Sequence, residues 1–356
     1  MSDNDHPVPV SLITGFLGSG KTTLLNRLLH SGDLKETALI INEFGDVGID
    51  HLLVETADEG IIELSDGCLC CTIRGDLIDT LTRLLNRSPP PARIIIETTG
   101  LADPAPILHA IMGHPVLVDL LRLDGVITLV DSANGMATLD EHEEAVKQVA
   151  VADRIVLTKA DITPIDTALI ERLKRLNPTA QIFDNIEDKP VADMLFNCGL
   201  YNPTTKTADV SRWLNNEASK TLHHHHHDIN RHDARIRAFT LITDQAIDAQ
   251  TLATFIDLLR SAHGPNLLRV KGIVKITEDQ DKPVVIHGVQ QIFHPPATLP
   301  NWPSEDHRTR LVMITKDLSE SFVQKLFDAF IGKPNIDTPD KEALDNNPLL
   351  VPGVNL

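Results

Sequence analysis

Aromatic residues and cysteines are scarce in this chain, and it has no long hydrophobic run. Only 4% of its 356 residues are aromatic and only four are cysteine, which excludes a small secreted scaffold held together by disulfides. No apolar stretch reaches the roughly 20 residues that a transmembrane helix needs, so we expect no membrane partner. The segment Met1 to Pro9 has neither the basic start nor the apolar core of a secretory signal, so we expect a cytoplasmic protein.

Positive charge is also in short supply. The chain has 32 Lys and Arg against 50 Asp and Glu, a formal net charge of −18. Binding to nucleic acid requires clustered basic side chains that displace counterions from phosphates, so we expect no nucleic-acid partner. The hydrophobic content of 42% is typical of a globular chain long enough for two domains.

The sequence does contain a phosphate-binding loop. Gly15 to Thr22 match the pattern G-x-x-x-x-G-K-[ST], follow the apolar run Val8 to Ile13 and precede a helical pattern over Thr23 to His30. Glycines let successive N–H groups face phosphate oxygens, the lysine reaches the β and γ phosphates, and the hydroxyl serves Mg²⁺. The predicted nucleotide-binding residues are Gly15, Gly18, Ser19, Gly20, Lys21, Thr22 and Thr23, and Lys21 is also predicted to be catalytic.

Short runs rich in β-branched residues recur after the P-loop, with helical patterns between most of them. They span Ala38 to Ile41, Arg93 to Ile96, Gly125 to Val130, Arg154 to Leu157 and Gln181 to Phe183. This alternation predicts an α/β fold of the P-loop NTPase type, with a mainly parallel sheet covered on both faces. In such a sheet the ligand lies beyond the carboxyl ends of the strands.

Three polar loops follow these runs. Asn42 to Asp50 occupy the position of a switch segment in P-loop GTPases. In the next loop, the Glu97 carboxylate can hold Mg²⁺ through water and the Gly100 N–H can contact the γ phosphate, so we predict a catalytic role for Glu97. In the third, Asp161 can accept hydrogen bonds from guanine while the Lys159 stem lies along the base. A solvated ion pair at a strand end is the alternative for these last two residues.

Two positions depart from the usual pattern of a guanine-nucleotide enzyme. Thr158 stands where the guanine motif has asparagine, so an amide that normally braces the base site is missing, and we expect a weakened guanine preference. Leu101 stands where Ras-type enzymes have a glutamine that orients water. Because a leucine cannot orient water, we expect intrinsic hydrolysis well below about 10 per second, the median for enzymes.

A cluster of thiols precedes the helical pattern that runs from Ile73 to Leu85. It consists of Cys68, Cys70 and Cys71. Three soft donors this close suit Zn²⁺ or Cu(I), and a tetrahedral zinc ion needs a fourth ligand, which His114, Glu43 or Asp46 can supply. Redox-sensing thiols and packing cysteines are the alternatives. Because the cluster lies between the switch-like segment and Glu97, we expect metal affinity to depend on the nucleotide state.

Histidines form a second candidate metal-binding segment. His223 to His227 is an unbroken run inside a polar stretch that we expect to be a linker. Consecutive imidazoles have few uses in a core, so the run indicates metal capture, and a merely hydrophilic linker is the alternative.

Five motifs in this order resemble the CobW-type, YjiA-like family of P-loop GTPases, whose members act as metal insertases or zinc metallochaperones. The motifs are GFLGSGKT, NEFGDVGID, GCLCC, ETTGLADP and TKAD. The resemblance implies GTP or GDP with Mg²⁺ at Gly18 to Thr23, guanine recognition at Asp161, metal at the three clustered cysteines, and a histidine-rich stretch that holds metal for transfer. It extends to runs such as Leu267 to Ile276 and Arg310 to Ile314 in the C-terminal half.

These observations divide the chain into four parts. We predict a P-loop GTPase domain over residues 1–205, a His-rich linker over 206–235, a smaller α+β domain over 236–332 and a loosely held tail over 333–356. The α+β prediction rests on a strand pattern at Ile236 to Leu241 and helical patterns at Ala249 to Ala262 and Phe322 to Phe330.

The function that this sequence favours is a GTP-hydrolysing metallochaperone. It would bind Zn²⁺ or a related transition metal at the clustered cysteines and deliver it to an apo-metalloprotein client according to nucleotide state. One alternative is a metal storage or sensing protein in which the nucleotide is only structural. Another is a cobalt or iron insertase that serves cobalamin synthesis or nitrile hydratase.

Overall fold

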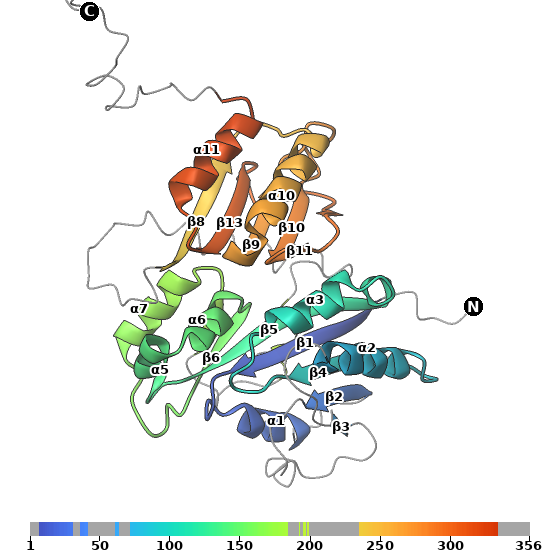
Figure 1. Ribbon diagram of the computed structural model, residues 1–356, viewed down its shortest axis with the longest axis vertical. Coiled ribbons are helices and arrows are strands. Elements are labelled where there is room, and N and C mark those ends of the chain that lie inside the picture. The colour runs from blue at the N-terminus through green and yellow to red at the C-terminus, as the bar shows by residue number, and fades with distance from the viewer. Residues whose placement is uncertain are drawn as a thin grey trace, which may run out of the picture.

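The computed structural model describes residues 7–30, 36–41, 61–63, 72–183, 192, 195–196, 198 and 235–333. These residues form two sheets, each covered by helices (Figure 1). The strands of the first sheet are β1 (Val8–Gly15), β2 (Thr37–Ile41), β3 (Ile61–Glu63), β4 (Arg93–Glu97), β5 (Leu121–Asp131), β6 (Arg154–Thr158) and β7 (Gln181–Phe183).

The first sheet is entirely parallel. Its strand order is β3-β2-β4-β1-β5-β6-β7, so β1 lies at the centre and all carboxyl ends share one edge. At this edge Glu63 pairs with Ile41, Ile41 with Glu97, and Glu97 with Ile13. The predicted α/β fold with a parallel sheet is confirmed.

Helices cover both faces of this sheet. They are α1 (Lys21–His30), α2 (Thr72–Leu85), α3 (Ala105–Gly113), α4 (Leu117–Leu120), α5 (Gly135–Glu141), α6 (Glu143–Ala150) and α7 (Thr167–Leu176). Successive strand residues point to opposite faces. Ile13 therefore packs against Leu25 of α1, whereas its neighbour Leu12 packs on the other face with Leu81 of α2 and Leu108 of α3.

Strand β5 begins four residues before the apolar run that predicted it. The reason is Asp124, which interrupts the hydrophobic pattern and yet is buried within the strand. Its Oδ2 atom accepts a hydrogen bond of 2.8 Å from Arg93 Nη1 on β4 and lies 3.3 Å from the Ser11 hydroxyl on β1. Because its carboxylate is paired, Asp124 can lie inside a strand that hydropathy alone would start after it.

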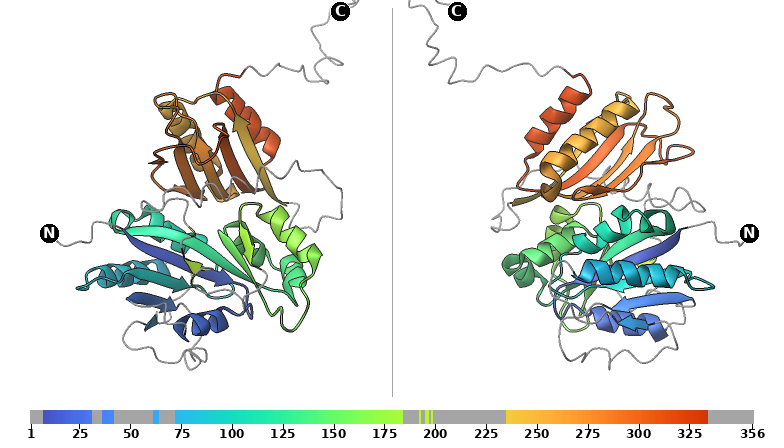
Figure 2. Two further views of the ribbon diagram at one scale, coloured as in Figure 1. Left: turned by 180° about the vertical axis from the view of Figure 1, so that it is seen from behind. Right: turned by 45° about the vertical axis from the view of Figure 1, so that its right-hand side comes forward.

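The second sheet is antiparallel and smaller. Its strands are β8 (Ile236–Thr243), β9 (Leu267–Val274), β10 (Val284–Val289), β11 (Ile292–Phe293), β12 (Ala297–Thr298) and β13 (Thr309–Lys316). The order is β11-β10-β9-β13-β8, with β12 paired to β10. Helices α10 (Ala249–His263) and α11 (Glu320–Phe330) cover one face of this sheet (Figure 2), which confirms the predicted α+β domain.

Side-chain caps set where the helices of the second domain begin. Asp248 accepts a hydrogen bond from the Thr251 N–H at the start of α10, and Ser319 accepts one from the Phe322 N–H at the start of α11. Such caps satisfy backbone donors that have no partner within the helix. Within the described part of the chain, no helix is both long and apolar enough to cross a bilayer.

Two of the hydrophobic clusters contain residues of both domains. Ile236, Leu268 and Ile314 of the second domain belong to the same buried cluster as Val146 of α6 and Leu173 of α7. On the other side of the interface, Val289 and Ile292 join the cluster formed around α2 and α3.

A buried ion pair also crosses this interface. Asp153, just before β6, lies 2.5 Å through Oδ1 from both Arg269 Nη2 and Lys271 Nζ on β9. Its Oδ2 atom accepts a 2.9 Å hydrogen bond from the Val126 N–H. Burial raises the pKa of Asp153, but the two cations outweigh burial and hold the pKa well below its ordinary value.

Candidate functional site

The P-loop adopts a conformation that requires its glycines. Gly15, Gly18 and Gly20 have φ angles of +146°, +70° and +90°. Residues other than glycine seldom adopt such angles. The loop follows β1 and leads directly into α1, so its N–H groups add to those at the start of a helix, which attract anions. This is the strand, loop and helix context that a P-loop needs.

Lys21 is folded back over the loop. Its Nζ atom donates hydrogen bonds to the Gly15 carbonyl at 2.9 Å and to the Phe16 carbonyl at 3.3 Å, and the residue is only 9% exposed. These bonds hold the ammonium group at the mouth of the loop, where the β and γ phosphates of a nucleotide lie.

The residues predicted to hold Mg²⁺ lie at the ends of neighbouring elements. Thr22 lies in the first turn of α1, and Glu97 ends β4, the strand beside β1. Glu97 is 7% exposed. The turn after it is fixed because Thr98 donates its N–H to the Ile13 carbonyl and its hydroxyl to Thr14 Oγ1. A carboxylate and a hydroxyl are hard oxygen donors, so this set fits Mg²⁺.

Gly100 lies directly against the P-loop. A Cβ atom at this position would be 2.6 Å from the Leu17 nitrogen and 2.8 Å from the Leu17 Cα, so no larger residue fits without moving the backbone. The next residue, Leu101, is 54% exposed and offers no polar group. The structure therefore brings Gly100 to the P-loop, and its contact with the γ phosphate stays a prediction.

Thr158 braces the P-loop, a contact that the sequence did not reveal. Its hydroxyl donates a 2.8 Å hydrogen bond to the Ser19 carbonyl. This position thus supports the nucleotide site through the loop backbone, although it lacks the amide of the usual guanine motif.

Lys159 is paired with Asp131 rather than with Asp161. Its backbone is left-handed, with φ of +59°, and its Nζ atom lies 2.7 Å from Asp131 Oδ2 at the end of β5. Burial raises the pKa of Asp131, but hydrogen bonds from Lys159 and Asn134 outweigh it, and the pKa ends below its ordinary value. Asp161 is exposed in the turn that follows, which leaves its carboxylate open to a base.

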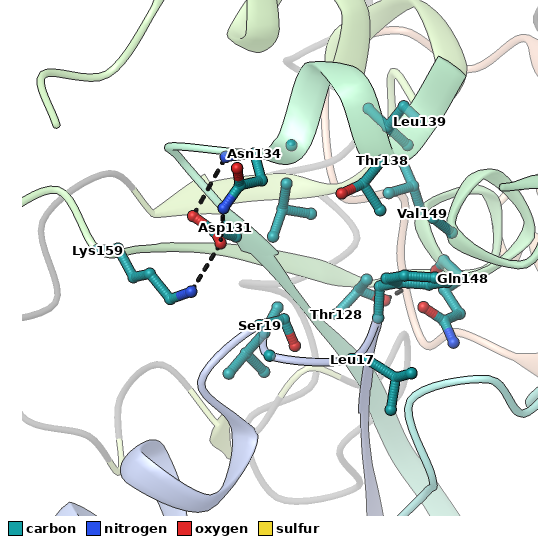
Figure 3. Close-up of a pocket in the computed structure, with 16 residues that line it drawn as sticks. Leu17, Ser19, Thr128, Asp131, Asn134, Thr138, Leu139, Gln148, Val149 and Lys159 are labelled. Carbon is teal, nitrogen blue, oxygen red and sulfur yellow. Dashed lines mark hydrogen bonds and ion pairs between the residues drawn. The ribbon is translucent and has the colours of Figure 1, made fainter. Parts of the chain in front are cut away.

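A cavity of about 300 Å³ adjoins these residues. It lies between the P-loop at Phe16–Ser19, the end of β5, and the helices α5 and α6 (Figure 3). Gly18, Ser19 and Lys159 are predicted nucleotide-binding residues that line it, while Leu139, Gln148 and Val149 close its far side. The cavity therefore connects the phosphate loop with helices that the sequence did not associate with function.

The predicted metal site is largely outside the described residues. Cys68, Cys70 and Cys71, the alternative ligands Glu43 and Asp46, and the run His223 to His227 all lie there. Among the residues that are described, no group of three possible metal ligands comes together. The clustered-cysteine site therefore stays a prediction.

His114, the remaining candidate ligand, is described. It follows α3, which starts just after the Gly100 loop and extends about 13 Å, given the rise of a helix. The preceding residue, Gly113, lies beside Ile292 of the second domain. The structure therefore does not bring His114 to the P-loop, and its role as a metal ligand is untested.

Comparison with known proteins identifies both domains. Residues 9–184 match the family described as CobW/HypB/UreG, nucleotide-binding domain. Residues 236–331 match the cobalamin synthesis protein cobW C-terminal domain.

Two curated relatives align along most of the chain. It is 31% identical over 326 residues to the zinc chaperone YjiA of Escherichia coli, an alignment that covers 90% of this chain and 98% of the relative. It is 27% identical over 315 residues to the zinc-regulated GTPase metalloprotein activator 1 of Schizosaccharomyces pombe, covering 81% of this chain and 76% of the relative.

A solved structure extends the likeness to three dimensions. The crystal structure of Zn(II)-bound YjiA GTPase from E. coli is similar with a TM-score of 0.67 and 26% sequence identity, and covers 91% of this chain and 99% of that one. The resemblance inferred from the five motifs is thus confirmed, and the chain belongs to the CobW/HypB/UreG family of nucleotide-binding proteins and carries the family's CobW C-terminal domain.

Proposed function

We propose that this protein is a cytoplasmic GTP-hydrolysing metallochaperone that binds Zn²⁺ at Cys68, Cys70 and Cys71 and delivers it to a client protein. The observation that carries the proposal is the shared carboxyl edge of the parallel sheet. The P-loop, the Glu97 turn and the segment that leads to the cysteines all leave the sheet at that edge. The names of the relatives, a zinc chaperone and a zinc-regulated GTPase, support the same function.

Hydrolysis would proceed by positioning and charge stabilisation. The P-loop N–H groups and Lys21 hold the β and γ phosphates, and the Gly100 N–H contacts the γ phosphate. Thr22 and Glu97 would hold Mg²⁺, which supplies positive charge against the charge that develops on the phosphates. Leu101 beside the γ phosphate cannot orient water, so the intrinsic rate stays low until a partner or a rearrangement supplies that group.

Three paired residues at the carboxyl edge of the sheet would couple metal binding to nucleotide binding. Glu97 is paired with Ile41 of β2, and Ile41 with Glu63 of β3. The predicted switch segment begins one residue after Ile41, and the cysteines follow Glu63 by five to eight residues. A shift of the Glu97 turn on nucleotide exchange would therefore be felt at Ile41 and Glu63, the strand ends from which both segments continue. The fourth ligand would come from His114, Glu43 or Asp46.

Zinc affinity is expected to depend on the nucleotide. The Cys70→Ser, Cys71→Ser double variant should lose tight zinc binding but keep GTP binding, because thiolates are the soft donors and the P-loop is separate. In the parent protein, zinc affinity with a non-hydrolysable GTP analogue and Mg²⁺ should differ at least roughly tenfold from that with GDP, or about 1.4 kcal/mol of coupling. Competition with a chromophoric chelator measures both.

The control for this experiment keeps the cysteines and replaces His223 to His227 with serines, so that weak sites in the histidine run do not mask the cysteine site. Tight zinc binding that survives loss of both cysteines contradicts the assigned ligands. Equal zinc affinities in the two nucleotide states instead favour a storage or sensing protein.

Base recognition is expected to reside in Asp161. A carboxylate accepts from both the N1–H and the exocyclic amine of guanine, whereas an amide places a donor there. The Asp161→Asn variant should therefore lose GTP affinity by roughly 10²-fold and gain affinity for xanthosine triphosphate, whose C2 carbonyl accepts a hydrogen bond. Fluorescent-nucleotide displacement tests both. Asp166→Asn, at the N-cap of α7, is the matched control, and unchanged GTP affinity in Asp161→Asn would refute the assignment.

A further inference from the structure

One short helix touches both the Gly100 loop and the second domain. This helix is α6. Its contact with the loop is made by Gln148, which is fully buried although glutamine is usually exposed. No sequence motif marks this residue. Its burial among hydrogen-bonded groups requires an explanation.

The Gln148 amide holds the backbone on both sides of Leu101. Its Nε2 atom donates one 3.1 Å hydrogen bond to the Gly100 carbonyl and another to the Ala102 carbonyl. Both amide hydrogens are therefore used on a single three-residue segment. Each carbonyl lies in one peptide plane with the N–H of the next residue, so these bonds fix the planes that contain the Leu101 and Asp103 N–H groups and hold Gly100 in place through its carbonyl.

The same contacts set how closely the loop approaches the P-loop. Gly100 already lies against the Leu17 backbone, with no room for a Cβ atom. Among the residues that the structure describes, Gln148 Oε1 has no hydrogen-bond partner, and Gln148 lines the cavity behind the P-loop (Figure 3). Within that part of the chain, the amide is therefore held through its nitrogen, which donates to the Gly100 loop.

Ion pairs connect the N-terminal end of α6 to the second domain. Lys147 Nζ lies 3.8 Å from Asp103 Oδ2, just beyond the Gly100 loop, and 3.3 Å from Glu143 Oε1. Glu143 in turn forms an ion pair with Lys316 at the end of β13, and its Oε2 atom lies 3.9 Å from Arg235 Nη1. Charged contacts therefore run without a break from the loop to the second domain.

We propose that Gln148 is a positioning residue that orients Gly100 for contact with the γ phosphate, and that α6 couples this loop to the second domain. The proposal rests on the proposed GTPase function. Because coupling is reciprocal, a partner that displaces the second domain would also change how tightly the loop holds the γ phosphate.

The first test compares two buried amides. Gln148→Leu removes both donors to the Gly100 loop, whereas Asn177→Leu removes an equally buried amide that donates to the Val149, Ala150 and Ala152 carbonyls at and just after the C-terminal end of α6. We expect Gln148→Leu to reduce affinity for a non-hydrolysable GTP analogue at least roughly tenfold relative to GDP. Asn177→Leu should weaken the fold and leave the ratio of the two affinities unchanged.

The ratio is the informative quantity, because only GTP carries the γ phosphate. A general loss of stability lowers both affinities together. If Gln148→Leu lowers them equally, Gln148 is structural and the positioning role is wrong. If the parent protein itself neither hydrolyses GTP nor prefers the analogue in the presence of Mg²⁺, the proposed GTPase function fails instead.

The second test follows the second domain directly. Hydrogen exchange of the β13 peptide Thr309–Lys316 should differ between the GDP and GTP-analogue states of the full chain, and the difference should vanish in Glu143→Gln. Asp257→Asn, which removes an exposed ion pair with Arg260 on α10, is the control that retains the difference. Exchange in β13 that is the same in both nucleotide states of the parent protein overturns the coupling.

Discussion

Replacing Lys21 with methionine is expected to lower the kcat for GTP hydrolysis by roughly 10²- to 10³-fold, the range found when one preorganised donor is removed from a charge-stabilising site. Methionine keeps most of the aliphatic stem of this nearly buried side chain but removes the ammonium that now bonds to the Gly15 and Phe16 carbonyls. No other P-loop side chain carries positive charge to the β and γ phosphates. Phosphate release under saturating GTP measures the effect.

Lys174→Met is the matched control for this experiment, because it makes the same chemical change at an exposed position on α7. The two variants should have similar circular dichroism spectra. If Lys21→Met retains more than about a tenth of the parental kcat, Lys21 does not stabilise the transition state in the way described here.

Replacing Asp153 with alanine is expected to reduce the free energy of unfolding by about 3–5 kcal/mol, the cost of breaking a buried ion pair from one side. Alanine leaves Arg269 and Lys271 buried without their shared carboxylate, and it also removes the acceptor for the Val126 N–H. This loss of stability reflects the cost of leaving two buried cations unpaired more than the net contribution of the ion pair to stability. Urea unfolding at pH 7 followed by circular dichroism measures the difference.

Asp257→Ala provides the comparison, since its ion pair with Arg260 is exposed and should contribute no more than about 1 kcal/mol. The pH dependence supplies a second check. The pKa of folded Asp153 is held below its unfolded value of about 3.9, so its contribution is fully present above that value and is lost as pH falls further. The difference between parent and variant should therefore shrink below about pH 4. A loss under 1 kcal/mol at neutral pH contradicts this account.

Local patterns predicted most elements of this fold, because they depend on near neighbours in sequence. The runs at Gln181 to Phe183 and Arg154 to Leu157 match β7 and nearly all of β6, and Ala249 to Ala262 match α10 to within one residue. The strand order could not be predicted, since hydropathy does not show which buried strands are neighbours. β3 was also missed, because three residues give no periodicity.

The candidate site divides along similar lines. Residues within the P-loop are specified by a contiguous motif whose spacing reflects phosphate geometry, so the sequence was sufficient for them. Asp131, Gln148 and the brace from Thr158 were missed because each acts across a distance in sequence that no motif spans. The hydrophobic residues around Gln148 predict only a buried helix face and do not indicate a functional residue. Only the pairing of strands β5 and β6 brings Asp131 beside Lys159.

The hydrophobic cluster in which Ile236, Leu268 and Ile314 meet α6 and α7 also limits how this protein can be rearranged. A domain whose buried hydrophobic residues contact only one another can be excised or fused to another chain. Here a truncation before residue 236 would leave Val146, Leu173 and their neighbours in water, and would strand Asp153 as well. We therefore expect the two halves to unfold together, and a substitution on either side of the interface must be accommodated by the other.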